Sequence, residues 1–394
     1  MNLLLILTLL LIFYLIYILL KSYDINTLLT FLCSILILYI VLNPKECIAF
    51  TIAGAKLFFY AVFPSLFPFL VIVNLIISFG GIEIYSKLLG NLICKPLGLP
   101  KQCSLVLLVS VFCGYPLGAR YAAELYDQNL IDNKTFQRLL NIATNGSPLF
   151  IIGTVGTAML GHPTLGYILI VSNILSCVAI GILLPGRYKI KDNKLINKSY
   201  VPKNINLGVA MKIALEDAVK TCMSIGSFVI IFSVLINIIK SNGYFHTALM
   251  FVSNYTFIPF EILQGLILGV LEVTNGCNLI ASSSISFDYK LIITSFLIAF
   301  SGLSITSQVH SLVYKHGISM KKYISLKVLQ GIISCVITFL ICNMPFVNLT
   351  KETFVNNFES FVPSPYFFAI IICIITLPIL INKFRSFINI SKVN

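Results

Sequence analysis

The sequence predicts an all-α polytopic membrane protein made of two inverted repeats with broken or re-entrant helices. Hydrophobic residues make up 58% of the 394-residue chain and charged residues only 10%, whereas soluble domains usually carry about 25% charged residues. Apolar runs recur from end to end, each of about 20 residues and long enough to span about 30 Å of hydrocarbon. Glycine and proline interrupt several of these runs, which a simple membrane anchor does not require.

The apolar runs and the loops between them divide the chain into five segments. The run 2–20 lacks a charged segment before it and a small-residue cleavage site, so we interpret it as a retained span and not as a signal peptide. A second span is expected at 26–42 and a last one at 366–382. The predicted segments are 1–45 with two N-terminal spans, repeat A at 46–184, a basic linker at 185–205, repeat B at 206–345, and 346–394 with a polar loop, the last span and a basic tail.

Repeat A contains three predicted interruptions. The stretch Phe63–Pro68 holds two prolines and is expected to break a helix that continues to about residue 79. Cys113-Gly114-Tyr115-Pro116 and Asn145-Gly146-Ser147-Pro148 then interrupt the apolar region that follows. A span at 163–184 closes the repeat.

Repeat B follows a similar plan. An amphipathic segment at 206–222 precedes a span at 223–240. The next apolar run ends at Glu272-Val273-Thr274-Asn275-Gly276, and a second interruption falls at Ser301-Gly302, before a span at 324–343. The interruptions of the two repeats are separated by nearly equal lengths of chain, which indicates an internal duplication.

Charged loops predict opposite orientations for the two repeats. The formal net charge of +13 comes mostly from Lys and Arg in short loops, where these residues mark the cytoplasmic side and do not indicate nucleic-acid binding. With the linker 185–205 inside, the loop 346–364 lies outside and the lysines of 82–101 lie inside. Repeat A then begins outside and ends inside, and repeat B does the reverse. Such inverted repeats form a binding site near the middle of the bilayer.

The interruptions are the predicted substrate site. In lipid, irregular backbone persists only where protein or a water-filled cavity covers it, and interrupted spans are the best sequence indication of a transporter's binding site. The candidate substrate-binding residues are Gly114, Tyr115, Pro116, Arg120, Asn145, Gly146, Ser147, Thr274, Asn275, Gly276, Ser301 and Ser304. Thr306 and Gln308 add uncharged hydrogen-bonding groups nearby. Gly118 and Gly153 are interpreted as helix-packing positions.

Arg120 has two interpretations. Its planar guanidinium matches a carboxylate, so an arginine at bilayer depth suits an anionic substrate. Alternatively, Arg120 snorkels or pairs with Glu124, one helical turn later. A helix expected to start at Pro148, capped by Ser147 or Asn145, offers free N–H groups that also suit a carboxylate. An ordinary loop-to-helix start is the alternative there.

Glu272 is the candidate ion-coupling residue, because a lone carboxylate in an interrupted apolar segment is a candidate proton or cation site. Alternatively, Glu272 neutralises Arg120 or Lys220 across the repeat interface. The sequence contains neither a His-Glu-x-x-His nor a Gly-x-Ser-x-Gly motif, and its eleven cysteines are scattered without a paired framework. We therefore expect no enzymatic activity, no cofactor and no metal site.

Three stretches of repeat A resemble a known family. They are Phe63–Phe69, Gly114–Arg120 and Asn145–Gly156. These stretches are similar to those of the sporulation integral membrane proteins of the YlbJ (SpoVV) type, which contain a nucleoside-recognition or Gate domain. The resemblance covers roughly residues 47–343, more loosely in the second half.

The resemblance implies a transporter of endospore-forming bacteria, located in the outer forespore membrane, that moves dipicolinic acid out of the mother cell. Related Gate domains occur in concentrative nucleoside transporters. The expected partners are therefore a small anionic substrate and the lipid bilayer, and the expected mechanism is alternating access between the repeats. Coupling to a proton or another cation and assembly into a homo-oligomer are left open. The alternatives are a nucleoside or nucleobase carrier and a non-transporting scaffold for spore-envelope assembly.

The predicted orientation is testable by thiol labelling. A cysteine introduced at 190–200, in a background without reactive native cysteines, should be protected from an impermeant reagent added outside, because the basic linker is expected in the cytoplasm. A cysteine introduced at 350–358 should be labelled. The opposite labelling pattern would contradict the inverted arrangement.

Overall fold

The computed structural model describes residues 25–184 and 206–343. Within these two ranges the chain is helical, without a β-strand, as expected where the backbone must satisfy its own hydrogen bonds in lipid. Four of the described helices are long and apolar enough to cross a membrane, or up to six if each of two bent pairs counts as one span. The predicted all-α membrane fold is confirmed. The expected spans at 2–20 and 366–382 and the linker 185–205 lie outside the described residues.

The N-terminal helices α2 (Ile25–Leu42) and α3 (Pro44–Leu57) form a strongly bent pair, with 106° between their apolar segments. α3 continues through the π-helical turn η1 (Phe58–Val62) into α4 (Phe63–Ser78). The predicted break at Phe63–Pro68 is therefore wrong, since this stretch is helical throughout. Pro64 lies in the first turn of α4, directly after the π-helical turn, and Pro68 lies inside α4.

The rest of repeat A is a helical hairpin, a discontinuous helix and a span. The predicted interruption at Cys113–Pro116 is the turn between the packed helices α6 and α7, and the one at Asn145–Pro148 separates α8 from the π-helix η4. Both interruptions are confirmed. The elements are α5 (Gly81–Leu89), η2 (Gly90–Cys94), η3 (Lys101–Cys103), α6 (Ser104–Cys113), α7 (Leu117–Asp127), α8 (Asn133–Ile142), η4 (Leu149–Met159) and α9 (Pro163–Leu183).

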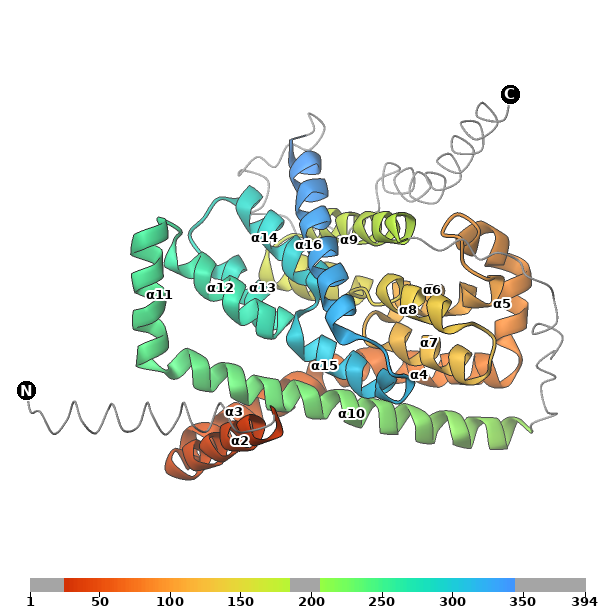
Figure 1. Cartoon of the computed structure of the whole chain (residues 1–394), viewed down its shortest axis with the longest axis horizontal. Coiled ribbons are helices and arrows are strands. Elements are labelled where there is room, and N and C mark those ends of the chain that lie inside the picture. The colour runs from red at the N-terminus through yellow and green to blue at the C-terminus, as the bar shows by residue number, and fades with distance from the viewer. Residues whose placement is uncertain (1–24, 185–205, 344–394) are drawn as a thin grey trace, which may run out of the picture.

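Repeat B has the same order of elements. Its hairpin turns at Glu272, its discontinuous helix is interrupted at Ser301, and a span follows, as predicted. The predicted separation of 206–222 from 223–240 is wrong, because both belong to the 35-residue helix α10, which runs along one side of the molecule (Figure 1). The elements are α10 (Leu207–Ser241), α11 (Gly243–Thr256), α12 (Phe260–Leu271), α13 (Val273–Ser282), α14 (Phe287–Phe300), α15 (Gly302–Val313), η5 (Tyr314–His316) and α16 (Met320–Cys342).

Small residues allow the close approaches on which this arrangement depends. Gly226 of α10 lies against the Phe58 ring, and a Cβ added to Gly226 would come within 2.6 Å of that ring. In the α12–α13 hairpin, a Cβ on Gly276 would lie 2.1 Å from the Gly269 Cα atom. Gly118 is confirmed as a packing position, since its Cβ would meet the Ala143 carbonyl oxygen. Gly153 is not, because a Cβ there meets only Leu149 of its own helix, at 3.7 Å.

The hairpin contact predicts a contrast between two glycine substitutions. Gly276→Ala should destabilise the protein by about 1–3 kcal/mol or more, because backbone atoms of α12 occupy the space of the new methyl group. Gly153→Ala is the matched control and should leave stability unchanged or slightly raised. The melting temperatures of the two purified variants in detergent measure the difference. Equal melting temperatures would show that the hairpin is more loosely packed than described.

Candidate functional site

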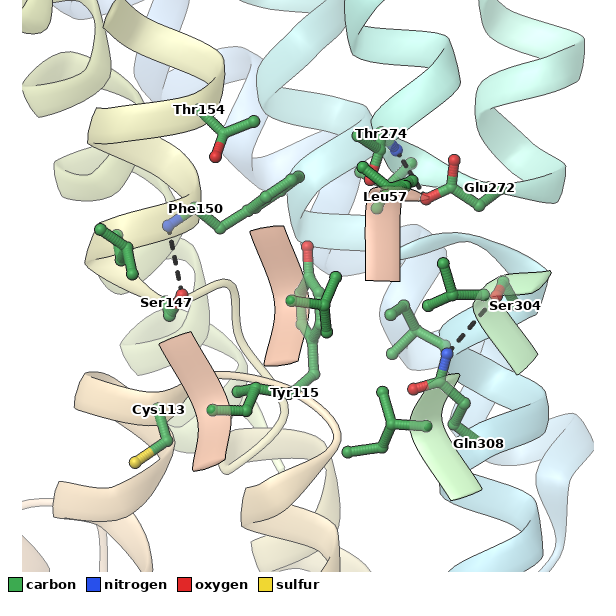
Figure 2. Close-up of a pocket in the computed structure, with 17 residues that line it drawn as sticks. Leu57, Cys113, Tyr115, Ser147, Phe150, Thr154, Glu272, Thr274, Ser304 and Gln308 are labelled. Carbon is green, nitrogen blue, oxygen red and sulfur yellow. Dashed lines mark hydrogen bonds between the residues drawn. The ribbon is translucent and has the colours of Figure 1, made fainter. Parts of the chain in front are cut away.

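A cavity of about 140 Å³ lies where the interruptions of the two repeats meet (Figure 2). Repeat A contributes Tyr115 from the α6–α7 turn and Ser147 from the second interruption. Repeat B contributes Glu272 and Thr274 from the α12–α13 turn and Ser304 from the first turn of α15. Segments far apart in the sequence thus supply the polar groups of one site.

Apolar side chains make up most of the remaining wall. They come from three places: the α3–α4 region, the middle of α10 and the start of η4. Cys113, Thr154, Val273, Ile305 and Gln308 complete the lining. The apolar contributors are Leu57, Val62, Leu66, Ile225, Val229, Leu149 and Phe150. The cavity is therefore an apolar chamber with a few convergent polar groups, which is the usual composition of a small-molecule site.

Glu272 caps the start of α13 with its own side chain. Its carboxylate accepts hydrogen bonds from the backbone N–H groups of Thr274, at 2.9 Å, and Asn275, at 2.8 Å. The Asn275 side-chain amide donates a further bond of 2.8 Å. None of the ion pairs among the described residues includes Glu272, so pairing with Arg120 or Lys220 is not its role in this conformation.

Tyr115 connects the two interruptions of repeat A. Its backbone N–H donates to the Asn145 carbonyl oxygen at 2.6 Å, and its ring meets the Phe150 ring edge-on, with 6.5 Å between the centroids. The Tyr115 hydroxyl points between Phe150 and Thr274 (Figure 2). This hydroxyl is buried and has no hydrogen-bond partner among the described residues.

The helix that starts at Pro148 is capped as predicted, and Ser147 is the cap. The Ser147 hydroxyl accepts from the Phe150 N–H at 3.2 Å. Asn145 turns away from this helix start, and its side-chain amide donates to the Ile142 carbonyl at 2.7 Å. Gly114 has a φ of 76° and approaches Ser147 so closely that a Cβ on it would lie 2.5 Å from the Ser147 nitrogen. The α6–α7 turn therefore rests directly on the second interruption.

Arg120 lies outside the lining of the cavity. Its guanidinium donates to the Thr221 hydroxyl and lies 3.9 Å from the Asp217 carboxylate, both on α10. Arg120 therefore forms its ion pair with Asp217. The alternative interpretation, in which Arg120 pairs with Glu124, named the wrong partner. Arg120 joins the first turn of α7 to α10, one helical turn along α10 from the cavity residue Ile225.

The other predicted site residues lie behind the cavity wall. Gly114, Pro116, Asn145, Gly146, Asn275, Gly276 and Ser301 are absent from the lining. Gly276 packs on α12, and Asn275 holds the Glu272 carboxylate. Ser301 is fully buried in a left-handed conformation at the junction of α14 and α15. These residues shape the interruptions and do not line the cavity.

Residues 59–183, from η1 to the end of α9, match the family model described as Gate, nucleoside recognition. The chain is 26% identical over 322 residues to the sporulation integral membrane protein YlbJ of Bacillus subtilis (strain 168), covering 77% of this chain and 79% of the relative. The resemblance seen in the motifs is confirmed.

Two solved structures are similar in fold. They are CNTnw in an inward-facing substrate-bound state, at 16% identity, and a doubly substituted variant of CNTnw in an outward-facing state, at 15% identity. Each comparison gives a TM-score of 0.47 and covers 72% of this chain and 75% of the solved chain.

A buried lysine behind the interruption at Asn145 was not predicted from the sequence. Lys327 of α16 is only 1% exposed, and its ammonium group donates to the Thr144 carbonyl and to Gln330 Oε1. Gln330 in turn donates to Asn145 Oδ1 at 3.0 Å. One sequence signal was available: a single lysine within an apolar span is a functional candidate by default.

The unpartnered Tyr115 hydroxyl predicts an unusual mutational result. Tyr115→Phe should leave the stability of the protein unchanged or slightly raised, because no protein hydrogen bond is lost. Tyr323→Phe is the matched control and should cost about 0.5–1.5 kcal/mol, because the Tyr323 hydroxyl donates to Thr144 at 3.0 Å. Thermal unfolding of both variants measures the contrast. Equal destabilisation would mean that Tyr115 bonds to the protein after all.

Proposed function

We propose that the protein is a membrane carrier that binds a small aromatic solute in the cavity and moves it by alternating access between the two repeats. The main support is the cavity itself, because its polar groups come from interruptions of both halves of the chain. A movement of one repeat relative to the other would therefore shift the polar groups on both sides of the bound solute, as alternating access requires. A scaffold would not require this convergence of polar groups in an apolar chamber.

The leading substrate is dipicolinic acid, an aromatic dicarboxylate, and the proposed location is the outer forespore membrane. Support comes from the likeness to a sporulation membrane protein. The cavity lining contains Glu272 but neither Lys nor Arg. Two like unit charges 4 Å apart repel by about 4 kcal/mol at an effective dielectric constant of 20. A carboxylate substrate therefore enters most favourably when Glu272 is protonated.

Protonation also frees the helix start for the substrate. A neutral carboxyl group is a weaker acceptor than a carboxylate, so the N–H groups of Thr274 and Asn275 become available to the substrate's carboxylate. Each substrate molecule would then travel with a proton on Glu272. This step makes Glu272 the coupling residue and assigns Arg120 to the contact between α7 and α10.

A nucleoside or nucleobase is the second candidate. The same lack of a lining cation favours it, as does the description of the matching family as nucleoside recognition. In this case the ionised Glu272 accepts hydrogen bonds from the substrate, and Tyr115, Thr154 and Gln308 supply neutral groups.

Uptake by proteoliposomes separates the candidates. If dipicolinate is carried with a proton, its uptake should rise as the pH falls, and Glu272→Gln should keep uptake but lose that pH dependence. If a nucleoside is the substrate, Glu272→Gln should weaken its uptake at every pH, because an acceptor is lost. Glu261→Gln, at an exposed position at the other end of α12, is the matched control. Uptake of neither compound would favour the scaffold, and an unchanged pH profile in Glu272→Gln would remove Glu272 from coupling.

A further inference from the structure

Lys327 places a positive charge at the carbonyl end of a half-helix, inside the protein. Its ammonium group donates to the carbonyl oxygen of Thr144, two residues beyond the last residue of α8. Its other partner is Gln330 Oε1, at 2.9 Å. Both acceptors are neutral, and none of the ion pairs in the described ranges includes Lys327. A buried charge normally requires a partner or a metal-like coordination by polar groups.

The surroundings of Lys327 form a connected network between the repeats. From the same face of α16, Tyr323 donates to the Thr144 hydroxyl and Gln330 donates to the Asn145 side chain. The Asn145 carbonyl accepts from the N–H group of Tyr115, which lines the cavity. A helix of repeat B therefore holds the interruption of repeat A that orients Tyr115.

The charge and the position of Lys327 suggest what its ammonium group replaces. The carbonyl end of a helix carries a partial negative charge. In carriers with discontinuous helices, unwound carbonyls and half-helix ends commonly coordinate the coupling cation, Na⁺ or H⁺. We propose that the Lys327 ammonium is a built-in cation at this position, so that the Asn145 interruption is held closed without a bound metal ion. Lys327 is then a positioning residue for Tyr115.

This inference rests on the proposed carrier function where it concerns transport. With Lys327 in place, Na⁺ has no role at this interruption. Substrate transport is then coupled to the proton on Glu272. A simple structural cap makes a different prediction. If Lys327 only supplies a hydrogen bond, its loss weakens the fold and no small cation restores it. If it stands in for a cation, its removal leaves the Thr144 carbonyl oxygen and Gln330 Oε1 beside a space that a small cation can occupy.

Thermal unfolding of the full-length purified protein tests the inference without any transport assay. Melting temperatures are compared in sodium chloride, methylammonium chloride and choline chloride at equal ionic strength, choline being too large for the vacated space. Wild type and Lys322→Ala, an exposed lysine of the same helix, should melt alike in all three salts. Lys327→Ala should melt several degrees lower in choline and recover much of that loss in sodium or methylammonium.

Two results would overturn the inference. One is an equal loss of melting temperature for Lys327→Ala in all three salts. The other is a gain in sodium for wild type as large as that for Lys327→Ala. If Lys327→Ala does not fold, Lys327→Ser, which leaves a similar space and adds a hydroxyl oxygen that can ligate a cation, takes its place with the same expectations. Because no substrate is present, failure of the carrier proposal leaves these outcomes unaffected, and their failure leaves the carrier proposal standing.

Discussion

The structure depends on one constraint: backbone groups freed where a helix is interrupted must find partners inside the protein, because lipid offers none. At three of the interruptions, the freed backbone groups have partners within the protein. The Tyr115 N–H group is paired with the Asn145 carbonyl, and the Thr144 carbonyl is paired with Lys327. At the α12–α13 turn, the freed N–H groups bind the Glu272 carboxylate. The Tyr115–Asn145 hydrogen bond holds the two interruptions of repeat A next to each other. The cavity lies where these interruptions meet those of repeat B.

The two repeats satisfy this constraint by different chemistry. The α6–α7 turn relies on a neighbouring backbone carbonyl and on a glycine that allows contact with Ser147. The α12–α13 turn relies on a carboxylate carried by the turn itself. The duplicated halves are therefore alike in the order of their elements but unlike in charge. The single charge that lines the cavity and the buried ammonium group beside the interruption of repeat A both come from repeat B, the first from the α12–α13 turn and the second from α16.

The sequence predicts the parts of this site that have local signals. Glycine, proline and polar residues within apolar runs identified the interruptions, and Tyr115, Ser147, Glu272, Thr274 and Ser304 line the cavity. The apolar wall was not predictable, because Leu57 or Ile225 differs from other leucines and isoleucines only in what it faces after folding. The partner of Arg120 lies about a hundred residues further along the chain, so local spacing pointed to Glu124 instead.

The π-helix η4 gives the cavity wall a property that the hairpins lack. A π-helix bonds residue i to residue i+5, and the Thr157 hydroxyl reaches the Ile152 carbonyl with this spacing, at 2.8 Å. Leu149 and Thr154, five residues apart, accordingly face the same cavity. Deletion of one residue within 149–159 would return a turn to the α-helical period and rotate the following side chains around the axis. In evolution, a one-residue deletion in η4 can therefore change which side chains line the cavity. The close-packed turns can change their lining only by substitution.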